Sequence, residues 1–157
     1  MPDLITAAIA RLTDAGLVQA DQLKGCAQAD IETIQAKYDL KLPATYRDFL
    51  TFMGRSAGKF LMGTDYLFPD VLTLREQADR LLRECEVKAT LGKEDFVFAA
   101  HQGYQFLFFN SRSSPDPEIF LYEEGEADFR SVADSFSKWF ADCVQDEIEA
   151  FKAVSGP

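Results

Sequence analysis

The sequence feature that most constrains the fold is the run FVFAAHQGYQFLFF, which begins at Phe96 and ends at Phe109. Two short apolar segments lie on either side of His101, Gln102 and Gly103, a spacing that predicts two antiparallel strands joined by a tight turn. Both faces of this hairpin are largely apolar and need cover near its middle. Because a two-stranded ribbon is only marginally stable in water, helices must cover the hairpin and further strands must extend it.

Shorter apolar segments supply the other expected strands. Residues 60–62 and 66–68 predict a first strand with a turn at 63–65, because the stretch from 54 to 69 contains three glycines. Residues 119–122 predict another strand, after the Ser- and Pro-rich loop 111–117. Alternation sorts the first hairpin strand onto two faces, with Phe96, Phe98 and Ala100 on one and Val97, Ala99 and His101 on the other.

Apolar residues at helical spacing predict three helices before the first strand. The first covers residues 4–12. The second follows Asp30, whose carboxylate is placed to cap the free amides of its first turn. The third starts at Pro43 and ends at Gly54. Its apolar face consists of Tyr46, Phe49, Leu50 and Met53.

Two further helices are expected. Thr73 and Glu76 have the spacing of a capping box ahead of a fourth helix. Ser131 with Asp134 can cap a last helix of about 20 residues. Its apolar face consists of Val132, Phe136, Trp139, Phe140, Cys143, Val144, Ile148 and Phe151. The elements predict one α+β domain over residues 1–157, in which a mostly antiparallel sheet is flanked by N-terminal helices and a long C-terminal helix.

Composition supports a folded protein without disulfides. The chain has 157 residues, of which 47% are hydrophobic and 13% aromatic, so its composition is not that of a disordered chain. The cysteines, Cys26, Cys85 and Cys143, are odd in number and widely spaced, which argues against a disulfide framework or a zinc site. Because no basic leader and no apolar run of membrane-spanning length is present, we expect a cytoplasmic protein.

The charge is strongly acidic and unevenly distributed. The formal net charge is −10, and residues 116–157 contain 3 of the 16 basic residues but 11 of the 26 acidic ones. Direct binding to nucleic acid is not expected, because phosphate contacts need Lys and Arg on the binding face. A basic protein partner is the favoured alternative. The acidic residues could also serve solubility alone.

No catalytic or metal-binding motif is present in the sequence. The segment GRSAGKF lacks the spacing and the Ser or Thr of a phosphate-binding loop. His101 is the only histidine, and its place in an apolar strand favours a hydrogen-bonded structural role over a catalytic one. We therefore predict no catalytic residues, no metal ligands and no cofactor, although a pair of carboxylates brought together by the fold cannot be identified from sequence.

One stretch resembles a known family. The run IETIQAKYDLKLPATYRDFLTFMG, residues 31–54, is similar to the N-terminal signature of the SUKH superfamily, and VADSFSKWF, residues 132–140, is similar to its closing helix. The resemblance spans roughly residues 28–145. Many relatives have Asn-Gly-Gly after the third helix, where this chain has Gly54, Arg55 and Ser56. That difference bears on the subfamily more than on the fold.

The resemblance implies function by protein binding. The superfamily includes fungal cell-wall assembly regulators of the Smi/Knr type and bacterial immunity proteins, which neutralise polymorphic or contact-dependent toxins, often nucleases or deaminases. An α+β fold with a mostly antiparallel sheet is implied as well. The residues that we expect to contact a basic partner are aromatic and acidic groups near the rim of the sheet: Asp65, Tyr66, Tyr104, Tyr122, Glu123, Glu124, Glu126 and Asp128. Core packing of the tyrosines and simple solvation of the acids are the competing interpretations.

Two other functions remain open at this point. A small-ligand-binding protein or hydrolase would use a cavity with His101 as its polar centre. An adaptor or regulatory protein would bind a partner in the same manner as an immunity protein. A deep open pocket in which His101 meets two carboxylates would favour the hydrolase.

Overall fold

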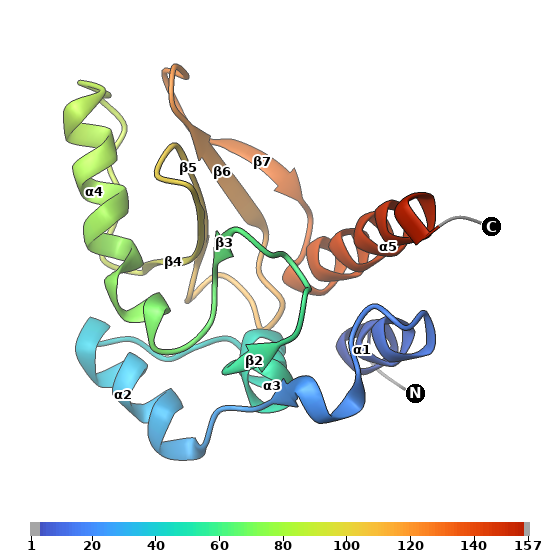
Figure 1. Ribbon diagram of the computed structural model, residues 1–157. Coiled ribbons are helices and arrows are strands. Elements are labelled where there is room, and N and C mark those ends of the chain that lie inside the picture. The colour runs from blue at the N-terminus through green and yellow to red at the C-terminus, as the bar shows by residue number, and fades with distance from the viewer. Residues whose placement is uncertain (1–3, 156–157) are drawn as a thin grey trace.

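The computed structural model describes residues 4–155 and contains five α-helices within that range (Figure 1). The helices are α1 (Leu4–Asp14), α2 (Gln28–Tyr38), α3 (Ala44–Met53), α4 (Leu74–Glu84) and α5 (Phe136–Ser155), with short 3₁₀ turns η1 (Ala20–Gln22) and η2 (Asp70–Thr73). The α+β class and the long C-terminal helix are confirmed. Within residues 4–155, none of the helices has the length and apolar character that crossing a membrane requires.

The strands form two antiparallel sheets. The larger has the order β3-β4-β5-β6-β7, in which every strand pairs with its neighbours along the chain. Its strands are β3 (Thr64–Asp65), β4 (Asp95–His101), β5 (Gln105–Asn110), β6 (Ile119–Glu123) and β7 (Arg130–Ala133). A small second sheet pairs β1 (Leu23–Lys24) with β2 (Ser56–Ala57). The predicted hairpin is therefore confirmed, and β4 and β5 lie inside the larger sheet.

A β-bulge changes the two faces predicted for β4. Val97 pairs with Phe108 but Ala99 pairs with Leu107, so Phe98 is an extra residue on its strand. Cross-strand partners point to the same side of a sheet, so beyond the bulge Ala99 returns to the face of Phe96. The predicted separation of Phe96 and Phe98 from Ala99 and His101 is wrong for this reason.

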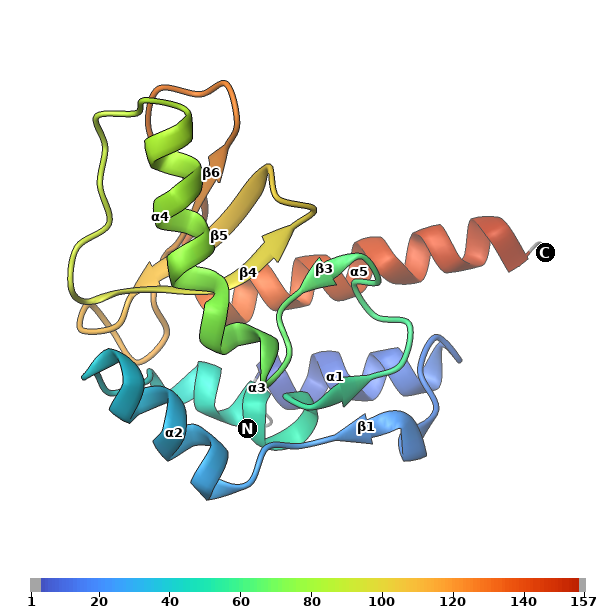
Figure 2. The ribbon, with the colours of Figure 1, turned by 60° about the vertical axis from the view of Figure 1, so that its left-hand side comes forward.

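Helices cover both faces of the larger sheet. Figure 1 shows α4 on one side of the sheet and α5 on the other, with α1 packed along α5, and Figure 2 shows α4 across the strands. On the α5 side the ring of Tyr46 on α3 lies at the centre of an aromatic cluster. Its neighbours, with ring centroids 5.3–6.0 Å away, are Phe49, Phe96, Phe98, Phe109 and Phe136. Such close edge and tilted contacts fix the helices on the sheet.

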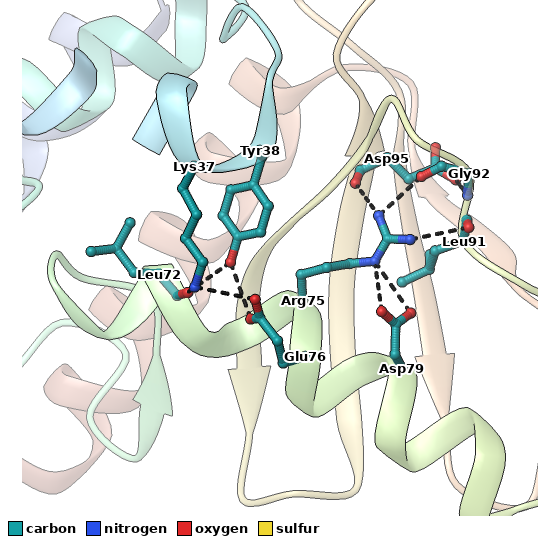
Figure 3. A network of polar contacts seen from close by, with 9 residues as sticks. All are labelled: Lys37, Tyr38, Leu72, Arg75, Glu76, Asp79, Leu91, Gly92 and Asp95. Carbon is teal, nitrogen blue, oxygen red and sulfur yellow. Dashed lines mark hydrogen bonds and ion pairs between the residues drawn. The ribbon is translucent and has the colours of Figure 1, made fainter. Parts of the chain in front are cut away.

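Polar contacts hold α4 to both of its neighbours (Figure 3). Arg75 donates to the carbonyl oxygens of Leu91, Gly92 and Asp95, at 2.9–3.1 Å, and binds Asp79 one turn further along the helix. Its guanidinium thus attaches the segment before β4 to the helix. The adjacent Glu76 points the other way, toward α2.

On that second side of α4, Glu76 pairs with Lys37 at 3.1 Å and accepts a hydrogen bond from Tyr38. The Lys37 ammonium and the Tyr38 hydroxyl also donate to the Leu72 carbonyl oxygen just before α4 (Figure 3). Two consecutive residues of α4 therefore bind different parts of the chain, one the sheet and the other α2.

The predicted cap at Asp30 is wrong by three positions. The helix begins after Ala27, and the Asp30 carboxylate accepts from the Ala27 amide at 3.0 Å. Asp30 therefore acts from the third helical position, as the acidic half of a capping box.

The capping box predicted at Thr73 is not formed. Thr73 has helical backbone angles, and its hydroxyl donates to the Asp70 carbonyl oxygen. The η2 turn runs directly into α4, so the start of α4 has no extended capping residue.

The last helix also starts later than predicted. Residues 130–133 form strand β7, which places Val132 outside α5, exposed. Ser135 caps α5 by accepting from the Lys138 amide at 3.1 Å. Another prediction that fails is the strand at 60–62, because these residues form turns. The expected turn at 63–65 instead contributes the two residues of β3. Strand β3 is only two residues long, which is too short for an alternating pattern to be recognised in the sequence.

Candidate functional site

The turn that joins β4 to β5 organises one end of the larger sheet. Gln102 and Gly103 have φ angles of 50° and 82°, as a tight hairpin with two left-handed residues requires. On one side of the turn His101 pairs with Thr64 of β3. On the other side Tyr104 accepts a 2.8 Å hydrogen bond from the Glu124 amide. Three segments distant in sequence are therefore held side by side at this end.

Six of the eight predicted contact residues lie at this end of the sheet. We call them the turn rim: Asp65, Tyr104, Glu123, Glu124, Glu126 and Asp128. From β3 to β6 is three strand spacings, so the rim extends over roughly 14 Å. Four of its acids are exposed, while Tyr104 and Glu123 are half-buried. The fold thus gathers them into one surface.

The other two predicted residues are in the core. Tyr66 is 4% exposed and donates to the Phe60 carbonyl oxygen at 2.7 Å. Tyr122 is 0% exposed, and its hydroxyl donates to the Glu126 carbonyl oxygen at 3.2 Å. Burial, followed by the neighbouring Cys85 thiol, raises the pKa of Tyr122 to about 12. Neither ring is placed to touch a partner, and Tyr122 instead fixes the turn that carries the rim acids.

The carboxylates of the turn rim are largely unneutralised. Glu123 has an ion pair, 3.7 Å long, with Arg130. Within residues 4–155, Asp65, Glu124, Glu126 and Asp128 have no ion pair with a basic side chain. Glu124, Glu126 and Asp128 share the turn between β6 and β7, and Asp65 belongs to β3. Unpaired like charges at one end of a sheet produce a negative potential there.

Beside the rim, His101 lines a small cavity of about 250 Å³ between the sheet and α5. Its Nδ1 atom is 2.9 Å from the Thr64 hydroxyl, and its ring meets Tyr104 edge to face at 5.5 Å. The lining residues are apolar or neutral apart from His101, and the volume is below the range of typical ligand pockets. His101 and two carboxylates do not converge there. Elsewhere in residues 4–155, no cluster of three His, Cys, Asp or Glu side chains suits a metal.

Sequence reasoning missed two exposed residues beside the rim. Met62 is 72% exposed, and Gln102 stands at the hairpin turn. Gly63, which follows Met62 in the chain, lies close to Gln102: a Cβ atom on Gly63 would be 3.6 Å from the side-chain amide nitrogen of Gln102. An apolar Met within a Gly-rich turn is the signal that could have identified this neighbourhood.

Comparison with known proteins identifies a family. The sequence model described as SMI1 / KNR4 family (SUKH-1) matches residues 25–142, three quarters of the chain. The match covers α2 through the first part of α5 and therefore the whole of the larger sheet. No curated protein matches the chain significantly.

Proposed function

The chain belongs to the SMI1/KNR4 family (SUKH-1), and on that premise we propose that it is an immunity protein that binds and occludes a cognate toxin domain. The partner would be a polymorphic or contact-dependent toxin of nuclease or deaminase type. The proposal places the protein in the cytoplasm, where such a toxin acts. Binding is assigned to the turn rim.

The observation that carries this proposal is the unpaired charge of the turn rim. Four of its acids are exposed: Asp65, Glu124, Glu126 and Asp128. Asp65 belongs to β3 and the other three to the turn between β6 and β7, and the pairing of β3 through β6 brings both segments to one end of the sheet. Repulsion between such acids destabilises the folded chain slightly, and a basic partner would relieve it. A toxin that binds nucleic acid presents the Lys and Arg side chains that this rim complements.

The rim is also rigid enough to act as a preformed surface. Its backbone is tied by the Glu124–Tyr104 hydrogen bond and by the buried Tyr122 hydroxyl. A partner therefore pays little ordering entropy on the backbone of this region. Beside the acids, Tyr104 and Met62 offer an aromatic and an apolar group for the desolvated centre of an interface.

The test is binding to any toxin-like protein that proves to be encoded beside the gene, measured at low and at physiological salt. The test variant carries Asp65→Asn, Glu124→Gln, Glu126→Gln and Asp128→Asn. The control variant removes four exposed acids outside the rim that form no ion pair within residues 4–155: Asp14→Asn, Asp21→Asn, Glu32→Gln and Asp48→Asn. Both variants change the net charge equally, so a difference between them reports position and not total charge.

We expect the rim variant to associate at least about tenfold more slowly at low salt and to lose most of its salt dependence, with the control close to wild type. No binding at low salt, or equal losses in both variants, would reject the proposal. A partner without toxic activity would assign the same surface to an adaptor or regulatory protein.

A further inference from the structure

A groove lies at the end of the larger sheet opposite the turn rim. Its volume is about 690 Å³, within the range of small-molecule sites. The walls come from the α2–α3 connection, the start of α3, the residues before β4 and the loop after β5. His101, at the end of β4 beside the turn rim, and Glu94, which lines the groove just before β4, are about 20 Å apart along the strand.

The groove is basic although the chain is strongly acidic. Four cationic side chains line it, Lys41, Arg47, Lys93 and Arg112, against two acidic ones, Asp39 and Glu94. The two acids form long ion pairs with Lys93 and Arg112, at 3.5 and 3.8 Å, between mostly exposed groups. Pairs of this kind are weak.

The other two cations are left for a ligand. Within the described part of the chain, 4–155, neither the Lys41 ammonium nor the Arg47 guanidinium forms an ion pair. Arg47 is only half-exposed and therefore carries its charge into the wall of the groove.

Two buried donors in the groove wall also lack partners. The Nε atom of Arg47 and the hydroxyl of Ser111 are inaccessible to solvent and have no hydrogen-bond acceptor among residues 4–155. Ser111 is 8% exposed as a whole residue. Leaving a buried donor unpaired costs about 1–3 kcal/mol, so native proteins rarely do so without a reason. Both residues line the groove, so a small rotation of either side chain toward it would let a bound anion supply the missing acceptor.

The start of α3 adds a third feature. Pro43 and Ala44 line the groove, so the positive end of a ten-residue helix faces it. The Thr45 amide is already used, since it donates to the Pro115 carbonyl oxygen at 3.1 Å. The Ala44 amide, one position earlier, has no acceptor within the helix itself. Helix starts of this kind bind phosphate through backbone amides and dipole together.

From these observations we infer that the groove is a binding site for a phosphate monoester. The planar guanidinium of Arg47 can hold two phosphate oxygens, and Ser111 can donate to a third. Leu40, Leu42 and Pro115 add apolar surface beside the cations, and the volume exceeds that of a bare phosphate ion. The organic group of the ester would occupy the part of the groove that the phosphate leaves empty. The site is independent of the turn rim and of the proposed partner.

The test uses the full chain with inorganic phosphate and phenyl phosphate as probes, at constant ionic strength, and sulfate as a third anion. Binding is followed by nitrogen–proton NMR, in which the Arg47 Nε–H group and the Ala44 and Ser111 amides each give a separate signal. We expect saturable shifts at these three signals, and phenyl phosphate at least about fivefold tighter than inorganic phosphate.

Four variants separate the outcomes. Arg47→Gln should weaken phenyl phosphate at least about tenfold, Arg47→Lys by less, and Ser111→Ala by a few fold. Lys59→Gln removes the same charge from an exposed site outside the groove and should bind normally. Urea unfolding without ligand shows that each variant is folded. Shifts that do not saturate, equal affinity for both phosphates, or the same loss in Lys59→Gln would each overturn the assignment.

Discussion

Replacing Arg75 with Ala should reveal how α4 is held to the sheet. The guanidinium donates to three carbonyl oxygens in the segment that leads into β4, and it binds Asp79 one helical turn away (Figure 3). Its side chain is only 21% exposed. Alanine keeps the helix, because it is the strongest helix former, but supplies none of these four interactions.

The expected loss of stability follows from this geometry. A hydrogen bond from a charged donor is worth about 1.5–3 kcal/mol when buried, and partial exposure lets water replace part of that, which leaves roughly 1 kcal/mol for each carbonyl. The i,i+4 ion pair with Asp79 adds about 0.3–0.5 kcal/mol. The total is about 3 kcal/mol, equivalent to a Tm lower by roughly 6–12 °C for a chain of this size.

Urea unfolding followed by circular dichroism measures this difference. With a slope of about 2 kcal/mol per molar urea, the midpoint should fall by roughly 1.5 M while the slope stays constant. Arg80→Ala is the matched control, because Arg80 is exposed on the same helix and its side chain forms no hydrogen bond or ion pair within residues 4–155. It should change stability by no more than about 0.5 kcal/mol. Equal losses in the two variants would refute the reasoning.

Three further predictions concern single groups. Tyr46→Phe should leave stability unchanged or raise it by up to about 1 kcal/mol in urea unfolding, because the buried Tyr46 hydroxyl has no partner within 4–155. Hydrogen bonds from Arg55 lower the pKa of Asp30 in the folded chain below its ordinary value of 3.8. The ionised Asp30 therefore stabilises the folded state at a pH above the unfolded pKa, and this contribution is lost as the pH falls through the folded pKa. Arg55→Gln should make the stability depend less steeply on pH below about pH 4. Burial raises the pKa of Cys26 to about 11, so with the other cysteines replaced by serine the folded chain should react with a thiol reagent at pH 8 at least about tenfold more slowly than in urea.

The parts of the fold that were predictable are those with a long periodic pattern. Each of the five helices is at least ten residues long, and each was found because its apolar residues recur at helical spacing. Strands β1, β2 and β3 have two residues each, and no periodicity can be recognised in so short a segment. Their positions depend on tertiary pairing, such as that of Thr64 with His101.

Helix starts failed for a different reason. Several polar residues near a start can each serve as a cap, and the chain in space selects among them. Ser131 belongs to β7 because residues 130–133 extend the sheet beside β6, and this leaves Ser135 to cap α5. Asp116 completes that start by accepting from the Ser137 amide, and it also accepts from Thr45 at the start of α3. A contact between residues so far apart in sequence leaves no local pattern to read.

The candidate sites show the same division between local and tertiary information. The acids at 123–128 could be assigned to a turn from sequence, because the glycine and the charges are local. The burial of Tyr122 could not, since alternation in a sheet covered on both faces does not distinguish an exposed ring from a buried one. Tyr66 lies just outside β3, and its burial depends on tertiary contacts such as its hydrogen bond to the Phe60 carbonyl oxygen. The basic groove was missed entirely, because Lys41, Arg47, Lys93 and Arg112 come from three separate segments and meet only after the hairpin has packed on α3. Net charge concealed it as well: a chain of charge −10 gives no hint of a local excess of cations. The total charge of this protein therefore agrees in sign with the turn rim and is opposite in sign to the groove.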